Sequence, residues 1–311
     1  MIDEFADGVD PKRVYVSSPT DFVFLCGGQN TDLSIPTPKS LRDAFHKITD
    51  FKPLKGSELI RAEDVEALHI AKSKYADLLS FETDLAQISK LVLLFSESFG
   101  SSAELGAFSV MPEIGSRMLV AMLNKHYEQT SFIKLGAIEY IRNRYGNFSF
   151  YVLDDKYIEI VSEKPTIATI EKLREVLEGP VSKRLAEIEN PRTFNPDSEG
   201  HVIKLVVGLL QEFGALTVEE IQTLLIAFDL YKKHSDIERY LLCAEVSGWA
   251  SMIRRGFHDF AVARDLPKDA ANFSFLDKCI EKNARRRREI RRSAYKEKDR
   301  DRFLVILQGL R

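Results

Sequence analysis

Glu104 is the side chain of this sequence that is best placed to do chemistry on a small molecule. It follows a run of five apolar residues, 91–95, which is too short for a globular helix and is typical of a strand buried on both faces. Small residues at 98 and 100–102 then let the backbone approach a ligand closely. In open α/β sheets, ligands bind at the carboxyl ends of the strands, against helix N-termini that favour negative charge. We therefore expect Glu104, at the start of the next helix, to be a candidate catalytic carboxylate.

The same residues also allow a structural role for Glu104. Ser101-Ser102-Ala103-Glu104 fits a capping box, in which a glutamate at the third helical position bonds back to the cap residue. Taken alone, these four residues favour the structural role. The two roles are compatible, because a helix N-terminus also keeps a carboxylate ionised at neutral pH.

Strand and helix patterns alternate through the first half of the chain, which predicts an α/β fold with a parallel sheet and right-handed crossovers. The expected strands are 22–26, 58–61, 91–95, 117–123 and 148–153. One helix is expected to begin after Ser40, and three more are expected over 62–78, 80–89 and 131–144. The first strand ends in Gly27-Gly28-Gln29-Asn30, which lacks the third glycine of a dinucleotide fingerprint and the lysine of a Walker loop. A structural turn is the favoured meaning of this glycine pair on its own.

The second half of the chain has a different amino-acid pattern, which is mainly helical. Residues 190–200 form a linker rich in Pro, Asn, Asp and Ser. Beyond it, the segments 201–213, 218–233 and 235–248 read as three helices, and 250–263 reads as a hairpin with a basic tip. This order predicts a mainly helical, winged-helix-like domain, which can read DNA with its third helix. The main polar residues of that helix are Glu238, Arg239, Tyr240 and Glu245, which do not form a strongly basic face. Packing of this domain against a partner protein or another copy of the chain is therefore an equal alternative to DNA binding.

The predicted domain division is linear. It comprises a catalytic domain over 1–165, a helical connector and linker over 166–199, a winged-helix-like domain over 200–270 and a basic C-terminal arm over 271–311.

The net charge of −3 hides an asymmetry in that arm. Residues 278–302 carry 12 Lys and Arg against 5 Asp and Glu, a balance of +7 that leaves −10 for the rest of the chain. Basic blocks of this kind usually contact nucleic acid or an acidic partner, whereas the interspersed glutamates favour a solvated helix. The candidate contact residues are Arg285, Arg286, Arg287, Arg288, Arg291 and Arg292.

Composition excludes several classes of protein. A chain of 311 residues that is 44% apolar can form two domains with ordinary cores. The three cysteines, Cys26, Cys243 and Cys279, are far apart and form no CxxC, which excludes a disulfide framework and a zinc site and fits a cytoplasmic protein. The acidic N-terminus and the lack of an apolar run of ~20 residues argue against secretion and membrane insertion.

Four motifs carry a family resemblance. FVFLCGG at 22–28, LLSFETDLA at 78–86, LLFSESFGSSAELGAFS at 93–109 and SFIKLG at 131–136 resemble the nucleoside 2-deoxyribosyltransferase-like effectors of bacterial retrons, in particular the RcaT-type toxins. The resemblance covers the first half of the chain, and the second half agrees only in architecture. It implies a Rossmann-like domain in which Glu104, the glutamate of the ELG motif, is the nucleophile that attacks the anomeric carbon of an N-glycoside. A carboxylate can stabilise or capture the oxocarbenium character that develops when such a C–N bond breaks.

The resemblance also implies a substrate pocket for NAD or a purine nucleotide, with no metal and no separate cofactor. Its lining would be Cys26, Gly27, Gly28, Gln29, Glu97, Ser98, Gly100, Ser101 and Ser102, with Glu63 and Asp64 as contacts to sugar hydroxyls. Glu97 could equally end its strand at the surface. Two positions depart from the family: Phe99 stands where proline is frequent, and Ala62 replaces the proline that tends to precede the acidic pair.

As an effector of anti-phage defence, such a toxin would deplete its nucleotide and arrest growth. The expected partners are a reverse transcriptase with its multicopy single-stranded DNA, which would restrain the toxin, and further copies of the chain in a homo-oligomer. Two alternatives remain: a non-catalytic regulator that senses a nucleotide and binds DNA, and a housekeeping transferase or phosphoribohydrolase, which would not need the second domain.

Overall fold

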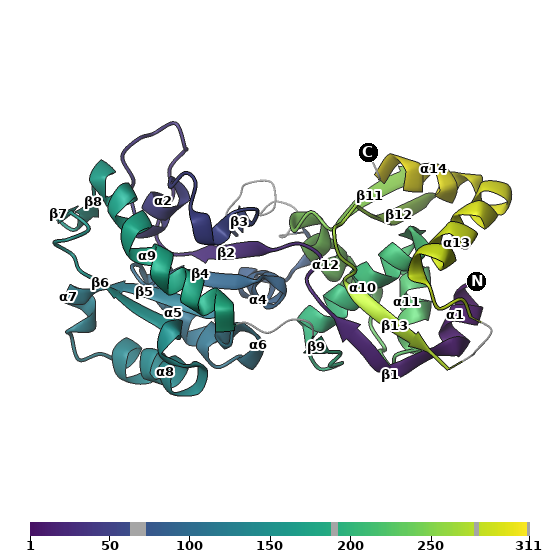
Figure 1. Cartoon of the computed structure of the whole chain (residues 1–311), viewed down its shortest axis with the longest axis horizontal. Helices are drawn as coiled ribbons and strands as arrows, with labels where there is room; N and C mark the ends of the chain where they lie inside the picture. The colour runs from purple at the N-terminus through teal and green to yellow at the C-terminus, as the bar shows by residue number, and fades with distance from the viewer. Residues whose placement is uncertain (63–72, 188–191, 277–279, 310–311) are drawn as a thin grey trace. The chain divides into compact units, whose positions relative to one another are not determined.

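The computed structural model describes residues 1–62, 73–187, 192–276 and 280–309. They form two compact units, and neither unit is continuous in sequence (Figure 1). The first unit, here called the sheet unit, combines Asp21–Asp64 with Ser89–Glu189; the second combines Met1–Thr20, Val65–Ile88 and Asn190–Arg311, each over its described residues. This division differs from the linear one expected from the sequence, because the first twenty residues pair with a strand near the C-terminus.

The sheet unit contains a five-stranded parallel sheet, as the sequence predicts. Its strands are β2 (Phe22–Cys26), β3 (Glu58–Ile60), β4 (Leu91–Phe95), β5 (Met118–Leu123) and β6 (Phe150–Leu153). Their order is β3-β2-β4-β5-β6, so that the chain leaves β2 in one direction and β4 in the other. The order therefore reverses between β2 and β4, and ligands of open α/β sheets bind outside the carboxyl ends of the strands at such a switch point.

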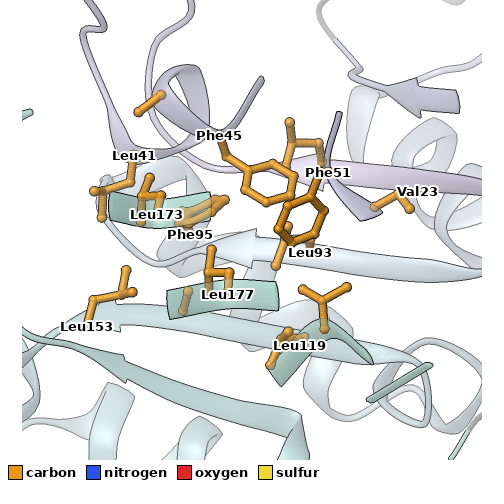
Figure 2. Packing of buried hydrophobic residues seen from close by; sticks show 14 of the residues in the cluster. Val23, Leu41, Phe45, Phe51, Leu93, Phe95, Leu119, Leu153, Leu173 and Leu177 are labelled. Carbon is orange, nitrogen blue, oxygen red and sulfur yellow. The ribbon is translucent and has the colours of Figure 1, made fainter. Parts of the chain in front are cut away.

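One face of this sheet is covered by α2 (Leu41–His46) and α9 (Ile167–Glu187). Figure 2 shows Phe45 and Phe51 above Leu93, with Leu173 and Leu177 of α9 beside them in the same core. The rings of Phe45 and Phe51 meet edge to face with their centroids 5.2 Å apart. Residues 167–187 therefore belong to the core of the sheet unit, whereas the sequence pattern places them in a connector.

The opposite face is assigned by the handedness of the crossovers. Since the connections after β2 and after β4 run in opposite directions, right-handed crossovers place α5 (Phe99–Ser109) and α8 (Glu139–Tyr145) on the face away from α2. The remaining elements of this unit are η1 (Lys52–Leu54), α6 (Pro112–Gly115), α7 (Asn124–Tyr127), η2 (Ile133–Ile138), η3 (Asn147–Ser149), β7 (Ile160–Val161) and β8 (Lys164–Pro165).

The second unit begins with α1 (Ile2–Gly8) and β1 (Val9–Val16). β1 is the centre of an antiparallel sheet between β13 (Ala271–Phe275) and β9 (Arg192–Thr193). The ring of Phe5 packs edge to face against Phe213, Phe273 and Phe275, with centroids 5.3, 5.2 and 5.5 Å away. This aromatic cluster joins the N-terminal helix to the C-terminal half of the chain.

The predicted three helices and hairpin are present in this unit. They are α10 (Glu199–Phe213), α11 (Val218–Ile226), α12 (His234–Val246), β11 (Ala250–Arg255) and β12 (His258–Ala263), and β10 (Ala215–Leu216) joins the hairpin in the order β10-β12-β11. α11 begins with a capping box, in which Oγ1 of Thr217 accepts the N–H of Glu220 and a carboxylate oxygen of Glu220 accepts the N–H of Thr217. α11 is shorter than predicted and ends at Ile226, since Asp229 takes a left-handed φ of 59° that no helix continues.

Three further helices lie in the described residues of this unit. α4 (Leu78–Ile88) packs against α10, and α13 (Ala284–Lys298) and α14 (Arg300–Gly309) pack against α10 and β12 respectively. Within the described ranges, the structure contains no helix that is both long and apolar enough to cross a bilayer.

Candidate functional site

A cavity of about 450 Å³ lies at the switch point of the parallel sheet. It is bounded by the residues that follow β2, β4 and β5 at their carboxyl ends, together with the β7–β8 hairpin. Its lining residues are Gly28, Gln29, Lys39, Ser40, Leu41, Glu97, Ser98, Leu123, Lys125, His126, Ile160, Glu163 and Pro165. Four of these, Gly28, Gln29, Glu97 and Ser98, are among the residues that the sequence predicts for the pocket.

Glu97 organises this cavity. Its carboxylate accepts backbone N–H groups from Gly28 at 2.8 Å, from Leu41 at 2.6 Å and from Arg42 at 3.0 Å. Burial raises the pKa of Glu97, although these hydrogen bonds act to lower it. Glu97 therefore does not end its strand at the open surface: it ties the glycine turn and the start of α2 to the end of β4.

The two glycines are required by this packing. A Cβ on Gly28 would lie 2.8 Å from Cβ of Ser40, and one on Gly27 would lie 2.7 Å from Cβ of Arg42. Real side chains do not approach so closely, so only glycine fits between β2 and the start of α2. The glycine pair therefore allows the turn after β2 to lie close to the start of α2.

The predicted capping box at Glu104 is wrong. α5 begins at Phe99, and its cap is Ser98, whose Oγ accepts the N–H of Ser101 at 3.1 Å. Ser101 completes the box, because its Oγ accepts the N–H of Ser98 at 3.0 Å. The helix starts three residues earlier than Ser101-Ser102-Ala103-Glu104 implies, and Glu104 lies in its second turn.

Glu104 flanks the buried side of α5. Ser101, Leu105 and Phe108 are fully buried, and Glu104 is half-buried beside them with its Oε2 atom buried. Helical side chains lean toward the helix N-terminus, so this carboxylate leans toward the carboxyl edge of the sheet. Glu104 is not among the residues that line the 450 Å³ cavity, and α5 lies on the sheet face opposite α2.

The other predicted pocket residues have varied positions. Cys26 is buried at the end of β2, Gly100 is exposed on α5, and Ser102 donates its hydroxyl to the carbonyl of Ser98 at 2.8 Å. Glu63 and Asp64 lie outside the described residues.

Three basic side chains of the cavity were missed by the sequence analysis. These are Lys39, Lys125 and His126. Lys125 and His126 directly follow β5, so the rule that pointed to the ends of β2 and β4 would also have found them. Nζ of Lys125 lies 3.3 Å from the exposed carboxylate of Glu163, and Lys39 is exposed at the rim. Two lysines around a cavity of this size can bind an anion such as a phosphate group.

Asp43 holds the loop that carries Lys39. It accepts the hydroxyl of Thr31 at 2.7 Å and the N–H of Lys39 at 2.9 Å. Burial alone would raise the pKa of Asp43, but these hydrogen bonds and nearby Lys47 lower it below its usual value. Asp43 is therefore a charged anchor for one wall of the cavity.

The predicted basic arm is a pair of packed helices, and this corrects two of its contact residues. Arg287 and Arg291 are buried, and both bind the buried carboxylate of Glu212 on α10. Arg288 is half-buried and lies 2.9 Å from Asp269. Of the six candidate arginines, only Arg285, Arg286 and Arg292 are exposed on α13, and the first two pair with Glu289 and Glu281.

Over the described part of the chain, no group of three or more His, Cys, Asp or Glu side chains is arranged to hold a metal ion. Cys26 and Cys243 are buried, and neither is in a disulfide.

The model of the STM3845 retron effector protein family matches residues 38–252. The chain belongs to this retron effector family. The match covers the cavity residues from Lys39 onward and the helices α10 to α12, whereas Gly28 and Gln29 lie before it.

Two curated relatives of this retron effector come from Escherichia coli. It is 28% identical over 205 residues to the "Retron Ec73 putative ribosyltransferase/DNA-binding protein", and 28% identical over 178 residues to the corresponding Ec86 protein. The alignments cover 61% and 53% of this chain. They span 63% and 55% of the relatives, which is less than two thirds of each.

Proposed function

We propose that this retron effector is a toxin that cleaves the N-glycosidic bond of a nucleotide, NAD or a purine nucleotide, with Glu104 as the nucleophile. The observation that carries the proposal is the switch-point cavity, which is lined by Ser98, the N-cap of the helix α5 that carries Glu104 in its second turn. The relatives are named for ribosyl transfer, a reaction that also breaks a bond at the anomeric carbon.

In the proposed reaction, a carboxylate oxygen of Glu104 bonds to the anomeric carbon while the C–N bond breaks. The electron pair of that bond leaves with the base: a purine takes up a proton as it leaves, whereas nicotinamide leaves NAD as a neutral base and needs no proton. Water then attacks the glycosyl ester, gives a proton to solvent and releases the sugar and the free carboxylate. Glu97 is a positioning residue in this scheme, because its oxygens are engaged by backbone N–H groups.

The cations of the cavity support a phosphorylated substrate. Lys39, Lys125 and His126 line the space at the ends of β2 and β5, where a 5′-phosphate or a diphosphate would meet them. A bare nucleoside offers these cations no charged group.

The second unit supports a winged-helix-like module in the proposed effector. The order α10, β10, α11, α12, β11 and β12, with β10 paired to the hairpin, supports such a module. We assign restraint of the toxin to a reverse transcriptase with its multicopy single-stranded DNA, which would contact Arg285, Arg286 and Arg292. A homo-oligomer is expected from the transferase-like relatives.

The test is a nucleotide profile of cells that express the wild type or Glu104→Gln, with exposed Glu58→Gln as the matched control. Gln keeps the size of the side chain and removes its charge. Toxicity and free base should vanish in Glu104→Gln alone, while the thermal unfolding of all three proteins stays alike. Retention of both by Glu104→Gln would make the nucleophile assignment wrong.

A second candidate is a nucleotide-sensing, DNA-binding regulator without catalysis. It is favoured by the fact that Glu104 does not line the 450 Å³ cavity, whereas two lysines do. In this case purified protein would release NAD or the purine nucleotide intact after incubation, and ligand would change its affinity for a duplex.

A further inference from the structure

The second unit has a concave groove of about 490 Å³ that the proposed catalytic function does not use. It lies between α12, the start of α11 and the β11–β12 hairpin. In a DNA-binding winged helix, this is the side on which the third helix enters the major groove and the hairpin follows the backbone.

The charges of this groove are wrong for DNA. Four of its lining residues are acidic, namely Glu219, Glu238, Glu245 and Asp259. His234 and His258 also line it, but only two lining residues are permanent cations, and each lies near one of these acids: Lys74 is 2.8 Å from Glu238, and Arg254 is 3.9 Å from Asp259. A surface that binds phosphates needs an excess of Lys and Arg, whereas here carboxylates exceed permanent cations by two.

The partial positive charge at the N-terminus of α11 is also neutralised. A helix N-terminus attracts phosphates, but Glu219 and Glu220 occupy its first turn. The oxygens of Glu220 are engaged by Arg302 at 2.6 Å and by the N–H of Thr217 at 2.9 Å. No anion site is therefore left at this end of the groove.

The floor and one rim of the groove are apolar. Leu241 and Leu242 of α12 form the floor, and Met252 of β11 is 40% exposed above it. Phe257, at the tip of the hairpin, is 99% exposed. An exposed aromatic residue beside an apolar floor and a charged rim is typical of a protein-binding site, where such rings are frequent anchors.

We propose that this groove binds a protein segment that carries both basic and apolar side chains, and that it does not bind nucleic acid. The apolar side chains of the segment would contact Leu241, Leu242 and Phe257, and its Lys or Arg side chains would meet Glu245 and Glu219. Charge complementarity selects this partner over an acidic protein and over DNA.

The test uses the full chain and two labelled synthetic peptides, one with leucine and lysine at helical spacing and one with glutamate in place of lysine. Fluorescence anisotropy should give binding of the lysine peptide only, and an excess of duplex DNA should not displace it. Binding of the glutamate peptide with equal affinity, or displacement by DNA, would overturn the proposal.

Variants locate the binding. Glu245→Lys and Phe257→Ala should each weaken binding by about tenfold. Their controls are Glu297→Lys, an exposed acid on α13, and Tyr231→Ala, an exposed aromatic outside the groove, which should stay within about twofold of the wild type. Because Phe257 is almost fully exposed, Phe257→Ala should leave the protein folded, and it therefore tests the site even if Glu245→Lys unfolds the protein. An equal loss in the controls would contradict a site in the groove.

Discussion

The carboxylate of Glu97, two residues beyond the end of β4, is hydrogen-bonded to the backbone N–H of Gly28 in the turn after β2. This contact joins the two strands between which the order of the sheet reverses. It fixes the shape of the cavity from within, because the same carboxylate also holds the first residues of α2.

Removal of the Glu97 carboxylate should therefore destabilise the sheet unit. Glu97→Ala leaves three backbone N–H groups without their acceptor, and we expect the free energy of unfolding to fall by about 3 kcal/mol. Urea unfolding at neutral pH measures this value, and exposed Glu58→Ala is the control. A loss in Glu97→Ala no larger than that in the control would contradict the anchoring role.

The pH dependence of stability should report on Glu212. Burial by itself would raise the pKa of Glu212, but Arg287 and Arg291 lower it below its usual value of 4.5. Since the unfolded chain then binds the proton more tightly, the stabilisation is present above pH ~4.5 and is lost as the pH falls through the lower folded pKa.

Glu212→Gln should remove this part of the acid sensitivity and cost about 3 kcal/mol at neutral pH, because it leaves two buried guanidinium groups without their carboxylate. Urea unfolding between pH 7 and about pH 3 compares it with the wild type. Glu289→Gln, which alters an exposed pair with Arg285, is the control and should follow the wild-type curve.

The arginines of α13 should fall into two classes. Arg291→Gln should lower the free energy of unfolding by about 3 kcal/mol, since Arg291 binds Glu212 and lies over the ring of Phe213 at 4.4 Å. The triple variant Arg285→Gln/Arg286→Gln/Arg292→Gln should unfold like the wild type, because these side chains are exposed.

If the three exposed arginines contact phosphates, the triple variant should also reduce the salt dependence of binding to single-stranded DNA. The slope of log affinity against log salt should fall in magnitude by about 2 for three contacts. An unchanged slope would show that these arginines do not bind the strand.

The sheet was predictable because its signal is local. The strands β2, β4 and β5 are continuous apolar runs, which a parallel sheet covered on both faces requires. The pairing of β1 with β13 joins residues more than 250 positions apart, and no local pattern reveals such a partner. The discontinuous units follow from that pairing.

The site was predictable only in part. Two overlapping serine patterns, at 98–101 and 101–104, can each cap a helix, and the sequence does not decide between them. The run of arginines in α13 likewise hides the single acid, Glu212, that draws two of them into the core, because this acid lies on another helix. The composition of a basic segment therefore does not reveal which of its arginines pair with acids elsewhere in the chain.

The two lysines of the switch-point cavity should discriminate phosphorylated from unphosphorylated ligands. Lys39→Ala and Lys125→Ala should each weaken binding of a purine nucleoside monophosphate by about tenfold, since each removes one charge-assisted contact. Binding of the corresponding nucleoside should change by less than about twofold, because it has no phosphate to lose. Isothermal titration of both ligands gives the two ratios, and exposed Lys55→Ala is the matched control. An equal loss for the nucleoside would mean that the lysines shape the cavity and do not bind a phosphate.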